Sequence, residues 1–551
     1  MTPTASTGPD WWRGAVIYQV YPRSFADANG DGVGDLAGIT AKLPYLAHLG
    51  VDAVWISPIQ TSPMKDFGYD VSNYDDIDPI FGTLADCDAL IERAHGLGLK
   101  VMIDQVLSHT SDQHPWFAES RSSRTNPKAD WYVWADARPD GSPPNNWKSV
   151  FGGSSWQWDT RRKQYYLHNF LAEQPDLNYH HPEVQAAALA SIRFWLDRGL
   201  DGFRFDTTNY FHHDHELRDN PPKQAHWSAA ELPANPYEMQ QHLYDKNRPE
   251  NTAWFERVRA LLNEYGAMSV GEVGDADALN LMIDYSAHHK RLHMTYSFAF
   301  LGTENDADHI RKHAVAFEEA SKDTGSWPCW TVGNHDAVRV RTRWHGEVDP
   351  NAFARMLLVL QTSLRGSVCW YQGDELALPE AELSFDELVD PPGIAFWPEY
   401  KGRDGCRTPM PWSVAQPQAG FSGGLDVPPW LPVKAPHQAL AVDACEANPD
   451  APLHVMRAWL AWRKTQAALV QGDVRHLPAS SHVLAVQRWA AGAASWLVVC
   501  NMSDQAAAWQ LPDGLAPQAT PQAPALPAHQ QGQLQGAQVQ LPPYGVWVAA
   551  V

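Results

Sequence analysis

The stretch DGFRFDTTN, residues 201–209, shows the pattern that decides the fold. Its apolar part ends in charged residues, and it follows the amphipathic stretch LASIRFWLDRGL at 189–200. Six other short apolar segments alternate with longer amphipathic stretches, at 15–22, 51–59, 99–109, 267–273, 329–336 and 366–375. Alternating strand and helix patterns indicate βαβ units and a parallel sheet. Seven or eight such units predict an α/β fold, a closed (β/α)8 TIM barrel with its active site at the carboxyl ends of the strands.

Two segments depart from this alternation. A Trp-, Pro- and Gly-rich tract at about 105–180 is far longer than a βα loop of about 2–6 residues, so an inserted small domain is expected after the third strand. Beyond a helix at 451–470, alternating strand-like pieces predict a C-terminal antiparallel β-sandwich domain, with a loop-like Ala/Pro/Gln-rich middle at 511–537. The expected division is barrel 1–104, inserted domain 105–176, barrel 177–473 and β domain 474–551.

Composition narrows the class of partner. The chain has 551 residues, 44% of them hydrophobic, which is typical of a globular protein of two or three domains. A net charge of −22 argues against nucleic acid or an anionic membrane and is compatible with a neutral small molecule. The six scattered cysteines suggest neither a disulfide framework nor a zinc site. No signal peptide or membrane span is evident, so a cytoplasmic monomer or homodimer is expected.

Acids, histidines and an arginine stand where the predicted strands end. They are Asp104, His109, Arg204, Asp206, Glu272, His335 and Asp336. Arg204 and Asp206 point to one side of their strand, because residues i and i+2 share a face. A single Arg-x-Asp is more often a structural ion pair, and a single histidine is more often a cap. Four strands ending this way favour one convergent site.

The acids suit glycoside hydrolysis with retention of configuration. That chemistry needs two carboxyl groups roughly 5–5.5 Å apart, in surroundings that push their pKa values apart. Asp206, beside the Arg204 cation, suits the ionised nucleophile. Glu272, within the apolar MSVGEVG, suits a carboxyl group kept protonated as the acid. Asp336 could hold sugar hydroxyls.

Several short motifs carry a resemblance to a known family. DQVLSH (104–109), GFRFD (202–206), GEV (271–273) and GNHD (333–336) resemble, in order, the four short regions of the α-amylase family of glycoside hydrolases. The resemblance narrows to the oligo-1,6-glucosidase and α-glucosidase branch, and to its bacterial maltose-type members that also transfer glucose. The motifs that narrow it are QPDLNY (174–179), GYDVSNY (68–74) and GRDGCRTPMPW (402–412).

The resemblance implies roles for individual residues. Asp206 would be the nucleophile, Glu272 the general acid/base and Asp336 the transition-state stabiliser. Arg204 would orient Asp206, supported by Asp104. The implied sugar contacts are hydrogen bonds from His109 and His335, stacking by Tyr69, and a neighbouring subsite lined by Phe151 and Phe170, for which a core position is equally open.

Two further expectations concern specificity. The resemblance implies that Asp70 and Arg407 pair to close the pocket around the terminal glucose, so cleavage is expected at chain ends. Thr207, next to the nucleophile, matches the maltose-preferring members, whereas the α-1,6 hydrolases usually carry valine there.

The loop DANGDGVGD, residues 27–35, raises the question of a metal. Oxygen ligands crowded on a tight turn suit Ca²⁺, although an Asp/Asn/Gly turn without metal is common. The resemblance implies a structural calcium held by the side chains of Asp27, Asn29, Asp31 and Asp35 and the carbonyl of Val33. Ser108 replaces the asparagine that a second family calcium uses, so that site is not expected.

The sequence therefore predicts an exo-acting retaining α-glucosidase that releases glucose from short α-1,4-glucosides such as maltose and transfers it to acceptor hydroxyls. An oligo-1,6-glucosidase and a sucrose-acting isomerase or transglucosylase remain open, because they share every catalytic residue. A metallohydrolase is disfavoured, since the paired histidines at 180–181, 212–213 and 288–289 are interpreted as loop residues. A non-catalytic transporter subunit or binding module is disfavoured, because it would need a membrane anchor or the loss of the catalytic carboxylates, and the sequence shows neither.

Overall fold

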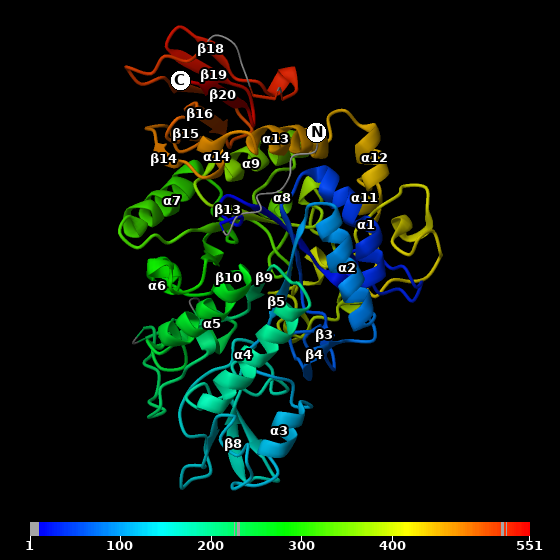
Figure 1. Cartoon of the computed structure of the whole chain (residues 1–551), viewed down its shortest axis with the longest axis vertical. Helices are drawn as coiled ribbons and strands as arrows, with labels where there is room; N and C mark the ends of the chain where they lie inside the picture. The colour runs from blue at the N-terminus through cyan, green and yellow to red at the C-terminus, as the bar shows by residue number, and fades with distance from the viewer. Residues whose placement is uncertain (1–9, 225, 229–231, 519–522, 525) are drawn as a thin grey trace.

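The computed structural model describes residues 10–224, 226–228, 232–518, 523–524 and 526–551. Residues 1–9, which belong to the N-terminal segment where no signal peptide is predicted, lie outside these ranges. Its centre is a sheet of eight parallel strands in the order β11-β10-β9-β5-β2-β1-β13-β12 (Figure 1). The strands are β1 (Val16–Val20), β2 (Ala53–Ile56), β5 (Lys100–Gln105), β9 (Gly202–Phe205), β10 (Met268–Val273), β11 (Met294–Ser297), β12 (Cys329–Thr331) and β13 (Ser367–Tyr371). A parallel bridge between Thr295 and Pro328 joins the two edges. The predicted (β/α)8 barrel is thereby confirmed, with β11 as the strand that the apolar pattern did not reveal.

Helices surround the barrel. The longer ones are α1 (Leu36–Leu49), α2 (Leu84–Gly96), α4 (Pro182–Asp197), α5 (Asn251–Tyr265), α6 (Ala278–Ser286), α7 (Ala307–Ser321), α9 (Pro350–Ser363) and α13 (Pro452–Arg463). Shorter ones are α8 (Val340–Arg343), α10 (Pro391–Ala395), α11 (Ala435–Gln438), α12 (Val442–Ala447) and α14 (Ala467–Val470). Thr83 and Asp86 form a capping box at the start of α2, which satisfies backbone N–H groups that have no partner inside the helix. The barrel interior is filled by buried side chains such as Ile17, Met102 and Val270, so it is a packed core rather than a pore.

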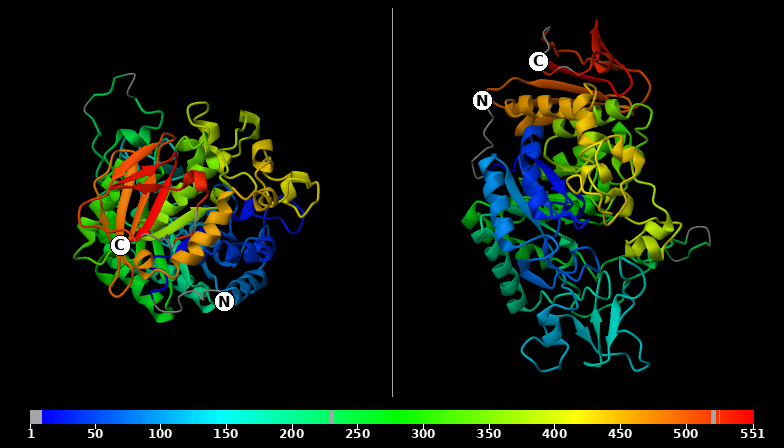
Figure 2. Two further views of the ribbon diagram at one scale, coloured as in Figure 1. Left: turned by 90° about the horizontal axis from the view of Figure 1, so that it is seen from above. Right: turned by 90° about the vertical axis from the view of Figure 1, so that its right-hand side faces the viewer.

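A small antiparallel sheet lies between β5 and α4, in the region where an inserted domain is predicted. It consists of β6 (Trp134–Ala135), β8 (Gln164–Leu167) and β7 (Trp156–Asp159), next to the short helix α3 (Pro115–Ser120). A cluster that includes Trp147 and Trp156 forms its own core. This region forms one end of the molecule in both side views (Figures 1 and 2). A separate two-stranded sheet, β3 (Gln60–Thr61) and β4 (Asn73–Ile77), follows β2.

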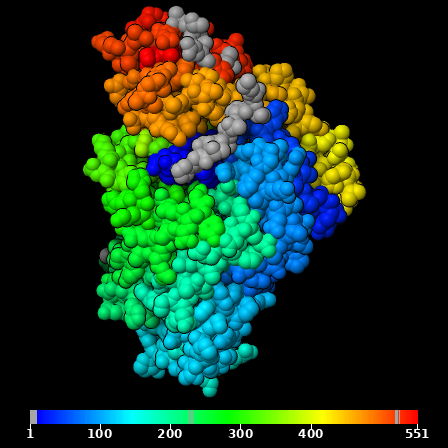
Figure 3. All heavy atoms as spheres, in the orientation of Figure 1, coloured from blue at the N-terminus to red at the C-terminus, as the bar shows by residue number. Residues whose placement is uncertain are grey.

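The C-terminal domain caps the opposite end, as the space-filling view also shows (Figure 3). One antiparallel sheet has the order β14 (Asp473–His476), β15 (Val483–Trp489), β16 (Trp496–Asn501) and β20 (Val546–Ala550). The other has the order β17 (Ala507–Gln510), β19 (Gln538–Leu541) and β18 (Gln533–Gln535). Leu497 and Val499 of the first sheet share a core cluster with Trp509 and Val539 of the second, which confirms the β-sandwich.

The segment 511–537, predicted to be loop-like, contains the short strand β18, while its residues 519–522 and 525 lie outside the described part. Within the described ranges, no helix combines the length and the apolar character needed to cross a membrane.

Candidate active site

A cavity of about 940 Å³ opens at the carboxyl ends of the barrel strands. Three acids predicted to be catalytic line it: Asp206 follows β9, Glu272 belongs to β10, and Asp336 follows β12. The other predicted site residues that line it are Tyr69, His109, Phe151, Phe170, Thr207 and His335. The structure therefore brings these side chains together, as the strand-end pattern predicts, while their catalytic roles stay predictions.

Arg204 lies fully buried under the acids. Its Nη1 is 2.8 Å from Asp206 Oδ1 and 2.5 Å from Asp104 Oδ1. Its Nη2 is 2.6 Å from Glu272 Oε1. The expected contacts with Asp206 and Asp104 are present. The expectation that Glu272 lies in apolar surroundings is wrong. Its neighbours along β10 are apolar, but the Arg204 guanidinium reaches its carboxyl group from β9.

The acids outnumber the cation they share. Burial raises the pKa of Asp206 well above its usual range; Arg204 opposes this effect, and the neighbouring Glu272 adds to it. Burial likewise raises the pKa of Asp104 to about 6, again opposed by Arg204. Since one guanidinium faces three carboxyl groups, the cluster retains a proton to higher pH than a solvated aspartate would.

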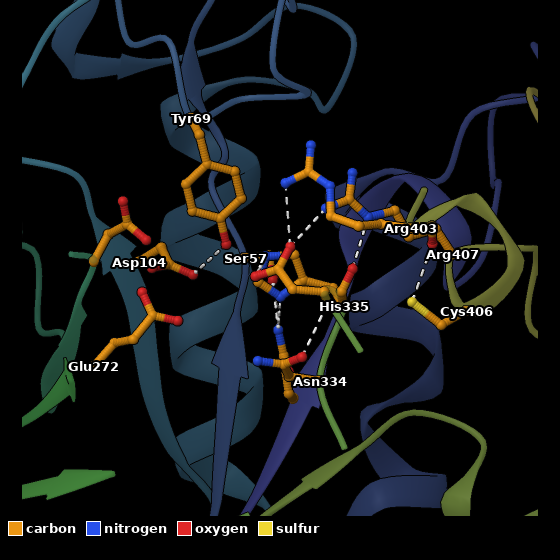
Figure 4. Close-up of polar contacts among 12 residues, drawn as sticks. Ser57, Tyr69, Asp104, Glu272, Asn334, His335, Arg403, Cys406 and Arg407 are labelled. Carbon is orange, nitrogen blue, oxygen red and sulfur yellow. Dashed lines mark hydrogen bonds and ion pairs between the residues drawn. The ribbon is translucent and has the colours of Figure 1, made fainter. Parts of the chain in front are cut away.

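Asp336 occupies a different electrostatic environment. Its Oδ1 is 2.8 Å from Arg407 Nη2 and 3.3 Å from Arg403 Nη1, and both arginines approach from one side of the site (Figure 4). Burial by itself raises the pKa of Asp336, but His335, Arg403 and Arg407 together hold it well below its usual range. Burial lowers the pKa of His335 well below its usual range, so the charge that stabilises the Asp336 carboxylate is that of the two arginines.

Hydrogen bonds fix His109 and His335, two of the histidines that line the cavity, in neutral forms. The amide of Gln19 donates to His335 Nδ1 at 2.8 Å, so His335 Nε2 carries the proton and faces Asp336 Oδ2 at 3.2 Å. The Tyr69 ring stacks on His335, with centroids 5.2 Å apart and planes at 2°. His109 Nε2 donates to the Tyr69 carbonyl at 2.9 Å, and burial lowers the pKa of His109 to about 4.

The predicted closing pair of Asp70 and Arg407 is wrong. Asp70 accepts hydrogen bonds from the Ser62 hydroxyl and from the backbone N–H groups of Lys65 and Asp66, at 2.9–3.0 Å. No ion pair joins Asp70 to Arg407 in the described ranges, where Arg407 instead pairs with Asp336. The turn between the two aspartates explains the difference, since Phe67 and Gly68 adopt φ values of 51° and 111° and Asp70 folds back onto the turn.

A different pair stands at the cavity wall. Asp66 Oδ1 lies 2.9 Å from Arg403 Nη2, and both residues line the cavity. Arg403 also binds Asp390 at 2.6 Å, so its guanidinium is held from behind. Asp66 and Arg403 each stand four residues before Asp70 and Arg407 in the chain, and spacing alone could not choose between the two pairs.

Thr207 sits between the nucleophile candidate and Glu272. Its backbone is left-handed, with φ 46° and ψ 49°, and its N–H points to Glu272 Oε2 at 3.3 Å. The Thr207 hydroxyl lies 2.8 Å from the hydroxyl of Ser108. Ser108, which departs from the family pattern, therefore contacts Thr207, the residue expected to determine the preferred linkage.

The sequence indicated loops such as 212–250 and 376–400 as walls of the acceptor subsite but identified none of their lining residues; the far wall of the cavity comes from the long segment after β9. Tyr237 stacks on His242 with centroids 3.7 Å apart, and its hydroxyl lies 2.7 Å from that of Tyr210. Lys246 pairs with Asp275 at 3.1 Å. These residues carry no strand or helix periodicity, so only the structure assigns them to the cavity.

The loop 27–35 binds its own backbone. The Asp27 carboxylate accepts from the N–H groups of Gly30 and Gly32, and the Asp35 carboxylate from those of Ala28, Asn29 and Gly38. Across the described residues, no group of three or more His, Cys, Asp or Glu side chains is arranged to hold a metal ion. The donors are all oxygen atoms, which suits Ca²⁺ in kind, but they are already engaged within the turn.

Comparison with known proteins identifies the family. The model of the alpha-amylase catalytic domain matches residues 19–472, which is most of the chain. The chain belongs to the α-amylase family. Membership in the α-amylase family agrees with the barrel, with the acids at its strand ends and with the four motifs that carry them.

Relatives of this chain within the α-amylase family bear the names of glucosidases and glucosyl-transfer enzymes. A probable alpha-glucosidase of Rhizobium meliloti is 55% identical over 514 residues, covering 91% of each chain. A maltase of Drosophila virilis is 38% identical, covering 90% of this chain and 79% of its own. The crystal structure of an alpha-glucosyl transfer enzyme is 52% identical with a TM-score of 0.92, covering 98% of this chain and 99% of that one.

Proposed function

We propose that the protein is a retaining α-glucosidase that removes glucose from the non-reducing end of short α-1,4-glucosides such as maltose and also transfers it to acceptor hydroxyls. One observation carries the proposal: the Asp206 and Glu272 carboxyl groups are both held by the Arg204 guanidinium beside one cavity that Asp336 also lines. Relatives named alpha-glucosidase and maltase support the same activity.

The proposed reaction is a double displacement. Asp206 attacks the anomeric carbon while Glu272 gives a proton to the glycosidic oxygen, so the C–O bond breaks and a glucosyl ester forms on Asp206. Water or an acceptor hydroxyl then attacks the same carbon, loses its proton to Glu272 and releases Asp206. Asp336, held as a carboxylate by Arg403 and Arg407, binds hydroxyls of the glucose unit.

Attack at chain ends is supported by the Asp66–Arg403 pair. Both side chains are nearly buried yet line the cavity, so together they can wall the terminal glucose unit. A charged pair held by Asp390 is better suited to this role than a mobile surface pair, which contributes little.

A second candidate is a sucrose-acting isomerase. It is favoured by the similarity to a trehalulose synthase structure, at 31% identity and a TM-score of 0.85 over 98% of this chain and 100% of that one. Thr207 favours the α-1,4 glucosidase, since valine is the residue that the α-1,6 hydrolases usually carry.

Time-resolved product analysis separates these functions. Purified enzyme is incubated with maltose, isomaltose, sucrose and trehalose, and proton NMR records the anomer released first. We expect α-glucose from maltose, with transfer products at high maltose, and no turnover by Asp206→Ala. A first-formed β-anomer would contradict retention, and trehalulose or isomaltulose from sucrose would favour the isomerase.

Ca²⁺ binding by the loop 27–35 is part of the proposal as a structural feature remote from the reaction. It is supported by the five oxygen-bearing positions Asp27, Asn29, Asp31, Val33 and Asp35, on a turn with left-handed Gly30 and Gly32. Chelation with EDTA should lower Tm by several degrees, and added Ca²⁺ should restore it. An unchanged Tm, together with no bound calcium by elemental analysis, would reject the site. The cytoplasmic location and the monomeric or dimeric state also stay predictions.

A further inference from the structure

The phenol of Tyr296 is buried between Arg204 and Glu272, and of these three residues only Glu272 lines the cavity. Its oxygen is 2.9 Å from Glu272 Oε1, 3.0 Å from Arg204 Nη2 and 3.2 Å from Arg204 Nε. The residue is 1% exposed and belongs to β11, the strand that the sequence did not reveal. None of the motifs contains it.

The chemistry of the three groups fixes the direction of each hydrogen bond. A guanidinium can only donate, so the Tyr296 oxygen accepts from Arg204. Burial raises the pKa of Tyr296 well above its usual range, which keeps the hydroxyl protonated. Its single proton is therefore free to point at Glu272 Oε1, which also forms an ion pair with Arg204 Nη2 at 2.6 Å.

The two oxygens of Glu272 are consequently unequal. Oε1 accepts the Tyr296 hydroxyl at 2.9 Å and forms an ion pair with Arg204 Nη2 at 2.6 Å, whereas Oε2 has the Thr207 backbone N–H as its partner at the longer distance of 3.3 Å. A proton placed on Oε1 would face the Tyr296 hydrogen and the positive charge of Arg204. A proton placed on Oε2 meets no such conflict.

We propose that Tyr296 is a positioning residue that, together with Arg204, reserves Glu272 Oε1 as an acceptor and makes Oε2 the oxygen that gives and takes the catalytic proton. This inference rests on the proposed function, because it assigns an oxygen to the general acid. Tyr296 acts through Glu272 and does not line the cavity.

The strand pairing holds Tyr296 in place. Tyr296 is the register partner of Glu272 on the neighbouring parallel strand, so both side chains share one face of the sheet. The Tyr296 ring packs against Trp55, with centroids 6.4 Å apart, in the core of the barrel. The charged or titratable groups that act on this phenol are Arg204 from β9, Glu272 from β10 and Asp104 from β5.

Tyr296→Phe removes the hydroxyl and keeps the ring. One donor to the Glu272 carboxylate is lost, so Glu272 should hold its proton to higher pH, and the basic limb of kcat/KM for maltose should move up by about one pH unit. At the optimum, kcat/KM for maltose should fall about tenfold. The kcat/KM for α-glucosyl fluoride should fall much less, because fluoride leaves with little help from an acid.

Two comparisons separate positioning from packing. Tyr285→Phe is the matched control, because its hydroxyl is also buried but accepts from Asn251 at 3.1 Å, so its pH profile and substrate ratio should match those of the wild type. Replacing Tyr296 with 3,5-difluorotyrosine keeps the shape and makes the phenol a stronger donor. The basic limb should then move to lower pH, opposite to the phenylalanine variant.

Opposite shifts in the two Tyr296 variants, with an unchanged control, support the inference. Equal losses on both substrates with an unmoved basic limb would overturn it and leave Tyr296 a packing residue. If Tyr296→Phe does not fold, an unmoved limb in the fluorinated enzyme overturns it alone. A wild type inactive on all four disaccharides would overturn the proposed function, and the inference with it.

Discussion

Arg204 is one cation among three carboxyl groups, and this imbalance controls the pH dependence of the site. Burial raises the pKa of Asp206 well above its usual range, with Glu272 adding to the effect and Arg204 opposing it. As a nucleophile, Asp206 must lose its proton, so activity rises with pH as that proton leaves. We therefore predict an acid limb of kcat/KM well above pH 4, the region where an ordinary aspartate titrates near 3.9. A limb at or below pH 4 would show that Arg204 outweighs burial.

The Asp66–Arg403 pair predicts where substrate affinity resides. Arg403→Lys loses the planar fork that reaches Asp66, Asp336 and Asp390, so KM for maltose should rise at least about tenfold. Initial-rate kinetics on maltose measure the change.

Arg365→Lys provides the matched control, since Arg365 pairs with Glu318 at 3.2 Å and does not line the cavity. Asp70→Asn should chiefly lower stability, because its carboxylate closes a backbone turn. A larger rise in KM for Asp70→Asn than for Arg403→Lys would restore the pair predicted from the sequence.

Thr207 predicts the preference between linkages. Thr207→Val removes the hydroxyl that lies 2.8 Å from Ser108 and places a second methyl group beside the nucleophile. The ratio of kcat/KM for maltose to that for isomaltose should fall by about tenfold, on the scale that one changed contact in a pocket gives. Competition assays with both disaccharides measure this ratio directly. An unchanged ratio would move the linkage determinant to the far wall of the cavity.

At the residue scale, the sequence predicts the side chains that end strands but not those whose direction depends on a turn. Asp206, Glu272 and Asp336 reach the cavity because β9, β10 and β12 aim them there. Asp66 and Asp70 are four residues apart in one loop, and the left-handed turn between them decides which one faces the cavity.

At the element scale, β11 is a strand that the hydrophobic pattern of the sequence does not identify. Its four residues, MTYS, include the polar Thr295 and Ser297, and no long apolar run marks them as a strand. Closure of the barrel required an eighth strand, but the sequence did not locate it, so Tyr296 could not be found either.

The junction between α9 and β15 makes a prediction about stability. Arg488 is fully buried and donates to the carbonyls of Ser363 and Leu364, both at 2.8 Å, where the end of a helix leaves acceptors without partners. Arg488→Met should lower the stability of the chain by about 3 kcal/mol or more, since it leaves these carbonyls buried and unbonded. Thermal unfolding measures the loss. Arg475→Met, at an exposed position of β14, should leave Tm nearly unchanged.

At the scale of the whole molecule, the order of segments was predictable and the walls of the cavity were not. The barrel and the β-sandwich follow from alternating patterns that run the length of the chain. The far wall comes from the segment between β9 and α5, whose residues Tyr237, His242 and Lys246 lack periodicity and are held by stacking and ion pairs. Such contacts depend on how individual side chains pack in the folded chain, and hydrophobic periodicity does not encode that packing.

The central claim is that Asp206 forms a transient covalent bond with the sugar, and trapping tests it most directly. The enzyme is treated with 5-fluoro-α-glucosyl fluoride, digested and mapped by mass spectrometry, with Asp206→Ala as the control. We predict one fluoroglucosyl group per chain, located on Asp206 and absent from the variant. A label on another side chain, or persistent turnover with no label on Asp206, would contradict the account.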